Sequence, residues 1–187
     1  MRPSPSLRLA DVSVRVPGRA GPVLHDTNLK LFQGDVGGVF GSSGTGKTTL
    51  LHTISGLLPW LRPGRVDGSV ELDGDTIDDL DPGQRAHLLA SCLDRAFAQL
   101  FLSTPREEIA AARALYGDTP LLDTALDDLG LRPLLDRKTP ELSSGERQRL
   151  ALTVALAGCP RPVLLDEPLA HLDRNGVAAL NGLNRLC

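Results

Sequence analysis

A glycine-rich segment around position 45 combines residue types that can bind a phosphate chain. Residues 41–48 read Gly-Ser-Ser-Gly-Thr-Gly-Lys-Thr, which matches the pattern G-x-x-x-x-G-K-[ST] in full. Glycines let the backbone turn its N–H groups toward an anion, and a helix that begins there adds its positive end. In such a loop, Lys47 reaches the β- and γ-phosphates of a nucleotide, and the Thr48 hydroxyl is a ligand of Mg²⁺.

The flanks of this segment favour a phosphate-binding loop over a chance match. The apolar stretch 36–40 predicts a strand that runs into the loop, and apolar residues at helical spacing over 47–58 predict a helix after it. We therefore expect ATP and Mg²⁺ as cofactors, with Lys47 also acting in catalysis. The residues expected to bind the nucleotide here are Gly41, Ser42, Ser43, Gly44, Thr45, Gly46, Lys47, Thr48 and Thr49.

Two adjacent carboxylates follow an apolar run near the other end of the sequence. Residues 163–165 are Val-Leu-Leu and lead directly into Asp166 and Glu167. Such a run is typical of a buried parallel strand, whose C-terminal end faces the ligand in open α/β sheets. Asp166 would hold Mg²⁺, directly or through water, and Glu167 would polarise the attacking water as a general base. Alone, the two acids could equally be solvated charges at a strand exit. Beside a complete phosphate loop, the catalytic interpretation is favoured.

A third segment combines a helix-start pattern with a short run of small residues. Residues 142–149 read Leu-Ser-Ser-Gly-Glu-Arg-Gln-Arg, and Ser143 and Glu146 have capping-box spacing, so a helix should begin here. A well-capped helix alone would account for the serine and the glutamate. The segment also resembles the LSGGQ signature of ABC ATPases, and the motifs follow one another in the order found in that family. In that family this helix end faces the nucleotide of the other subunit in a dimer, which adds Ser143, Ser144, Gly145 and Glu146 to the expected nucleotide contacts.

The resemblance to ABC ATPases covers residues 7–186 and implies a fold. The fold is α/β, a P-loop NTPase core with an antiparallel β subdomain and an inserted helical subdomain. The chain would be one domain, with residues 1–83 and 146–187 in the nucleotide-binding core and about 84–145 in the helical subdomain. The Ala- and Leu-rich composition of the latter region, with helical spacing, agrees with this division.

The same resemblance implies a function. The chain would be the ATP-binding subunit of an ABC transporter, an ATPase that couples ATP binding and hydrolysis to substrate movement through an integral-membrane permease. It would form a homo- or heterodimer with another ABC ATPase subunit, in the cytoplasm on the inner face of the membrane. Residues 168–173 resemble the D-loop of the dimer interface. Residues 99–101 and 105–110 resemble a sequence found in energy-coupling-factor importers.

Three departures from the family pattern support an alternative. Val16 stands where an aromatic residue stacks on adenine, and the Q-loop glutamine falls at either Asp94 or Gln99. No candidate switch histidine follows the D-loop, so the final strand and histidine region are expected to be missing. These departures would suit a hydrolysis-poor regulatory or truncated module that binds nucleotide. Soluble ABC proteins that act on DNA or ribosomes, and P-loop kinases, explain the motifs less well.

The remaining patterns indicate the elements that position these motifs. Alternation over 7–16 predicts a half-buried strand that ends at Pro17-Gly18, and further strands are predicted at 29–31, 68–74 and 163–166. Helices are predicted over about 145–157 and 174–186.

The composition indicates which binding partners and which cellular environment suit the protein. With 20 basic and 23 acidic residues and 3% aromatics in 187 residues, we expect no nucleic-acid partner. The sequence has neither a secretory signal nor an apolar stretch long enough to span a bilayer, so a membrane span would come from another chain. The cysteines, Cys92, Cys159 and Cys187, have neither metal-site nor disulfide spacing, which favours a reduced setting.

Overall fold

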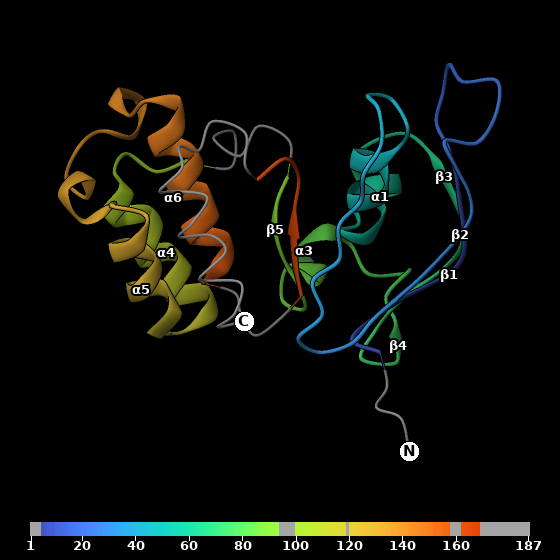
Figure 1. Ribbon diagram of the computed structural model, residues 1–187, viewed down its shortest axis with the longest axis horizontal. Helices are drawn as coiled ribbons and strands as arrows, with labels where there is room; N and C mark the ends of the chain where they lie inside the picture. The colour runs from blue at the N-terminus through green and yellow to red at the C-terminus, as the bar shows by residue number, and fades with distance from the viewer. Residues whose placement is uncertain (1–4, 94–99, 119, 158–161, 169–187) are drawn as a thin grey trace. The chain divides into compact units, whose positions relative to one another are not determined.

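A computed structural model describes residues 5–93, 100–118, 120–157 and 162–168 (Figure 1). The chain divides into two compact units, Met1–Leu89 and Ala90–Cys187. The first contains the glycine-rich loop, and the second contains the signature segment and the two carboxylates.

An antiparallel sheet of four strands, in the order β2-β1-β3-β4, forms the first unit's scaffold (Figure 1). Alternating apolar residues of β1 are buried, as the sequence predicts. The predicted strand at 29–31 is the end of a longer β2, and the one at 68–74 is shifted toward the N-terminus in β3. The bounds are β1 Leu7–Arg15, β2 Leu24–Leu31, β3 Arg65–Leu72 and β4 Asp75–Thr76.

A β-bulge explains a slip in the apolar spacing of β1. The pairing register shifts between Leu9 and Val12, and Asp11 has a positive φ of 51°. Opposite it, Gly68 has φ 92°, and a Cβ atom there would lie only 2.5 Å from the Asp11 carbonyl oxygen. The bulge therefore keeps Leu9 and Val12 on the buried face although they are three positions apart.

The first unit also carries three short helices around the sheet. The predicted helix over 47–58 is interrupted, because Gly56 has φ 79° and turns the chain out of the helix. The bounds are α1 Lys47–Ile54, α2 Leu57–Trp60 and α3 Pro82–Arg85.

A buried arginine holds the C-terminal end of α1. Arg85 is 2% exposed and donates hydrogen bonds to the carbonyl oxygens of Thr53 (2.9 Å), Ile54 (3.0 Å) and Leu80 (3.0 Å). Burial lowers the pKa of Arg85, and the charge of Asp78 partly restores it. The guanidinium supplies donors to carbonyls in the last turn of α1, which stabilises the end of the helix that follows the loop.

The strand predicted over 36–40 is not formed. A strand is completed by hydrogen bonds to a neighbour, and none of the described strands of the first unit pairs with these residues. Val36, Val39 and Phe40 are exposed instead, with Phe40 at 93%. The apolar run that suggested a strand thus enters the glycine-rich loop as irregular, unpaired chain.

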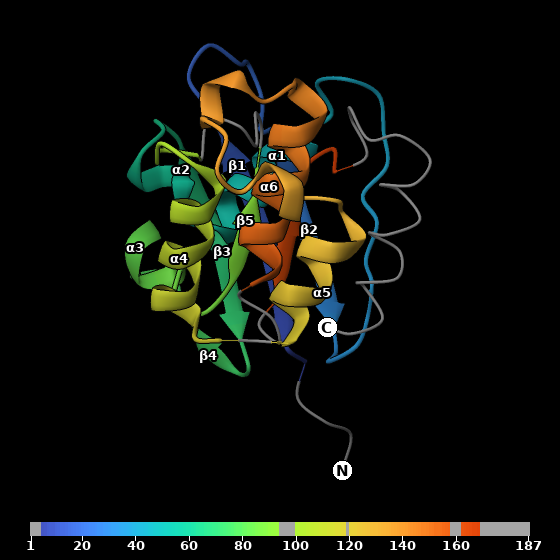
Figure 2. The ribbon, with the colours of Figure 1, turned by 90° about the vertical axis from the view of Figure 1, so that its left-hand side faces the viewer.

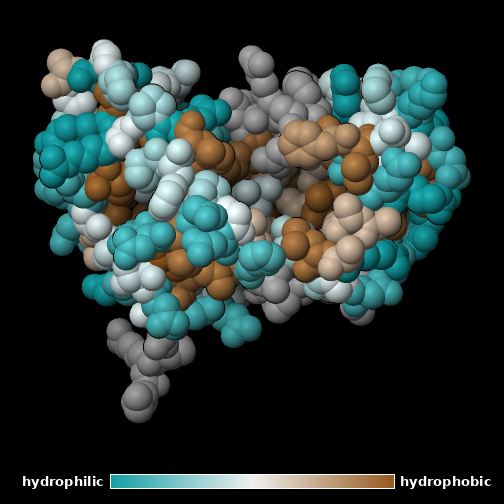
Figure 3. Space-filling view, turned by 180° about the vertical axis from the view of Figure 1, so that it is seen from behind, coloured by the Kyte–Doolittle hydropathy of each residue, from teal (hydrophilic) through white to brown (hydrophobic). Residues whose placement is uncertain are grey.

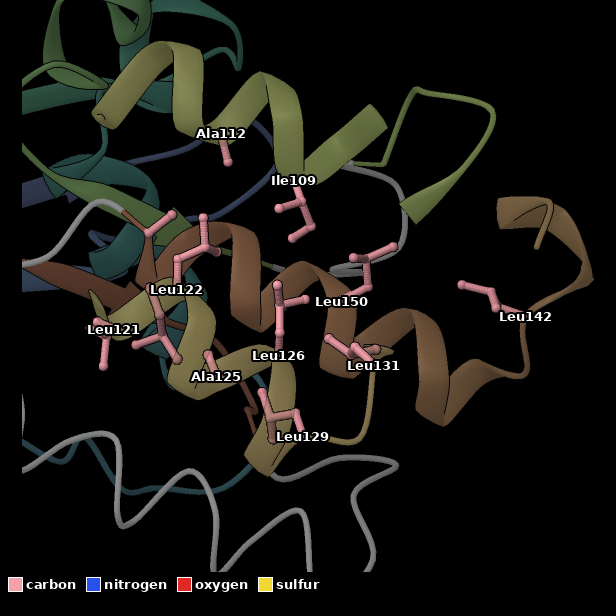
Figure 4. Close-up of a cluster of buried hydrophobic side chains, with 12 residues drawn as sticks. Ile109, Ala112, Leu121, Leu122, Ala125, Leu126, Leu129, Leu131, Leu142 and Leu150 are labelled. Atoms are coloured by element: carbon pink, nitrogen blue, oxygen red, sulfur yellow. The ribbon is translucent and has the colours of Figure 1, made fainter. Parts of the chain in front are cut away.

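The second unit combines a short parallel sheet with a helical cluster. Strands β5 (Ala90–Cys92) and β6 (Val163–Leu165) pair in parallel, and β6 confirms the predicted strand before the two carboxylates. Helices α4 and α5 both pack on α6 (Figure 2). Leucines from α5, from α6 and from the chain between them fill the space among the helices, with Leu122, Leu131 and Leu150 fully buried (Figure 4). The helices are α4 Pro105–Tyr116, α5 Pro120–Asp128 and α6 Ser144–Leu156, with 3₁₀ turns at Arg132–Leu134 and Thr139–Glu141.

Polar residues cover much of the face of each unit that is visible in Figure 3, with apolar residues showing between them. Within the described part of the chain, every helix is too short or too polar to cross a bilayer.

Candidate nucleotide-binding site

The glycine-rich loop opens the helix α1, as its sequence predicts. Gly46 caps α1 with φ 102°, and Gly44 has φ 82°, a backbone conformation that L-residues rarely adopt. A Cβ atom at Gly46 would lie 3.0 Å from Leu24 Cδ2 and 3.1 Å from the Val23 carbonyl oxygen. Glycine is therefore required at position 46 both by conformation and by close packing.

Side chains of the loop bind back to its own backbone. The Thr45 hydroxyl donates to the Ser42 carbonyl oxygen (2.9 Å), and Lys47 Nζ donates to the carbonyl oxygens of Gly41 and Ser42 (both 2.9 Å). Gly41 to Thr45 are exposed, whereas Lys47, Thr48 and Thr49 are half-buried on the first turn of α1. That turn carries no acidic residue. A cation and a helix N-terminus thus meet at an accessible loop, which suits a polyphosphate anion.

A cavity of about 510 Å³ adjoins the first turns of α1. Thr49 and His52 line it from the helix, and Val16 and Pro17 line it from the loop between β1 and β2. Leu58, Arg62 and Pro63 complete its wall. The volume lies within the range of small-molecule pockets. Val16, where the resemblance to ABC ATPases would place an adenine-stacking aromatic residue, therefore borders a cavity beside the phosphate loop.

The signature segment in the second unit has the predicted cap. Ser143 caps α6: its hydroxyl accepts a hydrogen bond from the Glu146 N–H (3.2 Å), and Glu146 Oε2 accepts one from the Ser143 N–H (2.7 Å). These bonds from Ser143, and then the charges of Arg137 and Arg149, hold the pKa of Glu146 below its usual value. Ser144 and Gly145 occupy the first helical positions, so their N–H groups belong to the unpaired first turn.

The two carboxylates follow β6 directly. The Asp166 N–H donates to the Cys92 carbonyl oxygen (2.9 Å), which extends the β5–β6 pairing by one bond. Glu167 is exposed and has a left-handed φ of 46°. Burial, and then the charge of Asp166, raises the pKa of Cys92 to about 12, so that this thiol is a neutral core residue.

The expected Mg²⁺ ion would be coordinated by oxygen ligands. The described residues contain no group of three or more His, Cys, Asp and Glu side chains that could hold a metal by themselves. Thr48 in the first unit offers a hydroxyl and Asp166 in the second offers a carboxylate, and Mg²⁺ accepts both kinds of donor. Each residue by itself suits a Mg²⁺ ion whose remaining ligands are water and substrate phosphates.

Several predicted residues lie outside the described part of the chain. They include the two candidates for the Q-loop position, Asp94 and Gln99, and two cysteines, Cys159 and Cys187. Residues 169–173 of the D-loop segment and the last predicted helix, 174–186, also lie outside it. Sequence reasoning missed Arg85, because a helix end that is held by a distant arginine leaves no local pattern.

Comparison with known proteins points to one family. Residues 24–170 match the family described as "ABC transporter". The chain is 32% identical over 181 residues to a putative ABC transporter ATP-binding protein of Treponema denticola, covering 93% of this chain and 36% of that protein. It is 36% identical over 181 residues to the hemin import ATP-binding protein HmuV of Roseobacter denitrificans, covering 90% and 65%. It is 40% identical over 151 residues to the molybdenum import ATP-binding protein ModC of Rhizobium meliloti, covering 75% and 40%.

Two solved structures resemble the fold. One is an ATP binding subunit of an ABC transporter, with a TM-score of 0.78, 22% identity and coverage of 96% of this chain and 73% of that one. The other is cbiO1 from Clostridium perfringens, part of the ABC transporter complex cbiONQ, with a TM-score of 0.74, 25% identity and coverage of 98% and 73%. They confirm the predicted α/β fold class. The chain spans only 31% to 36% of the first curated relatives that it matches.

Proposed function

Because this chain belongs to the ABC transporter family of ATP-binding proteins, we propose that it binds ATP with Mg²⁺ and drives transport through a membrane permease. The observation that carries the proposal is the loop 41–46 opening α1, with Lys47 at its end and no acid in the first turn. The backbone N–H groups would hold the β-phosphate, and Lys47 would exchange its bonds to the loop carbonyls for bonds to the β- and γ-phosphates.

Hydrolysis would use the carboxylates of the second unit. Asp166 would hold Mg²⁺ together with Thr48, and the metal would supply charge stabilisation to the phosphates. Glu167, exposed at the end of β6, would orient the attacking water and accept its proton. No protein nucleophile is required, so the barrier is lowered by positioning and electrostatics.

The working form would be a dimer docked on a permease. In a pair of subunits, the N–H groups of Ser144 and Gly145 at the start of α6 would face the γ-phosphate held by the other subunit. HmuV and ModC are import proteins by name, which supports import and a place on the inner face of the membrane. The likeness to cbiO1, together with residues 99–101, supports the energy-coupling-factor type. The alternative of a hydrolysis-poor module is not favoured by these relatives.

Mg-ATP turnover of the purified chain, alone and with its permease, tests the proposal. We expect Lys47→Ala to abolish ATP binding. Glu167→Gln should retain binding but lose turnover by about 10²–10⁴-fold, the usual contribution of a general base. Lys30→Ala, which removes an exposed cation at the far end of β2 from the loop, is the matched control. Turnover that survives both Lys47→Ala and Glu167→Gln would contradict the proposed site.

A further inference from the structure

The sequence specifies a turn at the start of the loop between β1 and β2. Val16, Pro17, Gly18 and Arg19 form a tight turn, in which the Arg19 N–H donates to the Val16 carbonyl oxygen (3.4 Å). Proline at the second position and Gly18 at the third, with φ 80°, are the residues that a type II turn requires. The direction in which Arg19 leaves the turn is therefore set by two residues beside it.

This turn brings Arg19 against the phosphate-binding loop. A Cβ atom at Gly44 would lie 3.8 Å from Arg19 Nη2, which is van der Waals distance. The other end of the β1–β2 loop touches the same segment, since Val23 and Leu24 pack on Gly46. The Val23 N–H in turn donates to the Val14 carbonyl oxygen (2.7 Å). The β1–β2 loop thus contacts the phosphate-binding loop at two points, and Arg19 is its only arginine.

Among the described residues, no carboxylate forms an ion pair with Arg19. Its neighbours do have partners: Arg15 pairs with Asp67 at 3.3 Å, and His25 lies 3.1 Å from Asp26. The Arg19 guanidinium is exposed and faces a loop whose helix begins without an acidic residue. An arginine in this setting favours an anionic ligand, and its planar fork of N–H donors matches phosphate oxygens.

We propose that Arg19 is a second cationic ligand of the nucleotide's phosphates, acting beside Lys47. This inference rests on the proposed function, since it assumes that residues 41–48 bind a nucleoside triphosphate. Lys47 belongs to α1, whereas Arg19 belongs to the β1–β2 loop. Binding would therefore draw that loop onto the phosphates. Phosphate contact, rather than stacking on the base, follows from the position of the guanidinium over Gly44.

The test measures dissociation constants for ATP, tripolyphosphate and adenosine by titration calorimetry at low ionic strength. Arg19→Ala should weaken both phosphate ligands by about ten- to hundredfold, the range expected for charge-assisted hydrogen bonds, and leave adenosine unchanged. Arg19→Lys should recover part of the lost phosphate affinity, because lysine keeps the positive charge but lacks the planar pair of N–H donors of a guanidinium. Raising the salt concentration should shrink the difference between wild type and Arg19→Ala.

Control variants separate this inference from the proposed function. Lys30→Ala should leave all three affinities unchanged, and thermal unfolding should show that Arg19→Ala remains folded. If wild type binds ATP and Lys47→Ala does not, while Arg19→Ala binds ATP as wild type does, the Arg19 assignment alone is wrong. Equal weakening of adenosine and ATP would assign Arg19 to the base and overturn phosphate contact. If wild type itself fails to bind ATP, the proposed function and this inference are both wrong.

Discussion

At the residue scale, the candidate general base sits on an unusual backbone. Glu167 has φ 46°, in the left-handed region that costs an L-residue roughly 1–2 kcal/mol. The other described non-glycine residues with positive φ are aspartates, which tolerate this region better: Asp11, Asp26 and Asp73. A glutamate in this conformation, two residues after the end of β6, is expected if the position serves the proposed chemistry of its carboxylate rather than stability.

Replacing Glu167 should therefore separate stability from activity. We expect Glu167→Gly to have a higher free energy of unfolding than Glu167→Ala by about 1 kcal/mol or less, because glycine accepts positive φ but also gains freedom in the unfolded chain. Both variants should lose turnover. Urea denaturation of the two variants gives the comparison, and an alanine variant as stable as the glycine variant would show that the backbone relaxes when the side chain is removed.

The ionisation of Glu146 should link stability to pH. Its pKa is depressed below the ordinary value of 4.5 by hydrogen bonds from Ser143 and the charges of Arg137 and Arg149. A depressed carboxyl pKa contributes stability that is fully present above the unfolded-state pKa and is lost as the pH falls through the folded-state pKa. Glu146→Gln keeps the capping geometry but not the charge.

Denaturation of wild type and Glu146→Gln should be compared from about pH 7 down to about pH 3. The stability difference should be constant near neutrality and shrink only below the ordinary glutamate pKa. A difference that is already lost near pH 6, or that persists at the acid end, would show that the charge of Glu146 is not its cause.

At the element scale, helix starts are the best-specified features of the second unit. Ser143 with Glu146 begins α6, and Thr104 with Glu107 begins α4, both as complete capping boxes. Each box satisfies N–H groups that the helix cannot pair internally. In α6 the box also fixes where the first turn presents the N–H groups proposed to face a nucleotide.

Adjacent serines allow this cap to be tested with a matched control. Ser143→Ala should lower the free energy of unfolding by about 1 kcal/mol, the usual cost of losing a serine cap. Ser144→Ala should change it by less than about 0.5 kcal/mol, because Ser144 makes no capping bond. Both are measured without nucleotide, so that a role in ligand binding does not enter. Equal effects would mean that Ser143 does not act as the cap.

Local patterns made these elements predictable, and tertiary contacts account for what was missed. The cap of α6, the alternation of β1 and the β6 strand depend on neighbours in sequence, which the sequence displays. The strand expected over 36–40 depends on a pairing partner, and a hydrophobic run does not reveal whether one exists. Arg19 and Arg85 contact segments 25 and more than 30 positions away, respectively, and an isolated arginine leaves no periodic pattern in the sequence.

At the scale of the whole molecule, the proposed chemistry is divided between two units. The phosphate loop belongs to Met1–Leu89, whereas the carboxylates and the signature helix belong to Ala90–Cys187. Substitutions in the first unit should therefore affect ATP affinity, and those in the second should affect turnover and association. This division follows from the proposed roles and can be checked one variant at a time.

Association should depend on nucleotide. With Mg-ATP, Glu167→Gln should sediment as a dimer, because ATP that is bound but not hydrolysed would keep the two subunits closed on each other. The double variant Lys47→Ala with Glu167→Gln should remain monomeric, as should Glu167→Gln with ADP. Analytical ultracentrifugation distinguishes these states. A dimer that forms equally in every condition would assign association to a surface other than the nucleotide site.

The contact between Gly56 and Arg85 limits how this chain can diverge. A Cβ atom at Gly56 would lie 2.8 Å from Arg85 Cδ. The positive φ of Gly56 would also strain the backbone of any other residue at this position. Loss of Arg85 would open that space but would remove the guanidinium donor from the carbonyls of Thr53 and Ile54, of which Thr53 would keep only the Gly56 N–H (3.2 Å). A substitution at either position alone is therefore expected to lower the stability of the fold. A lineage that carries this pair is expected to keep both residues or to replace both together.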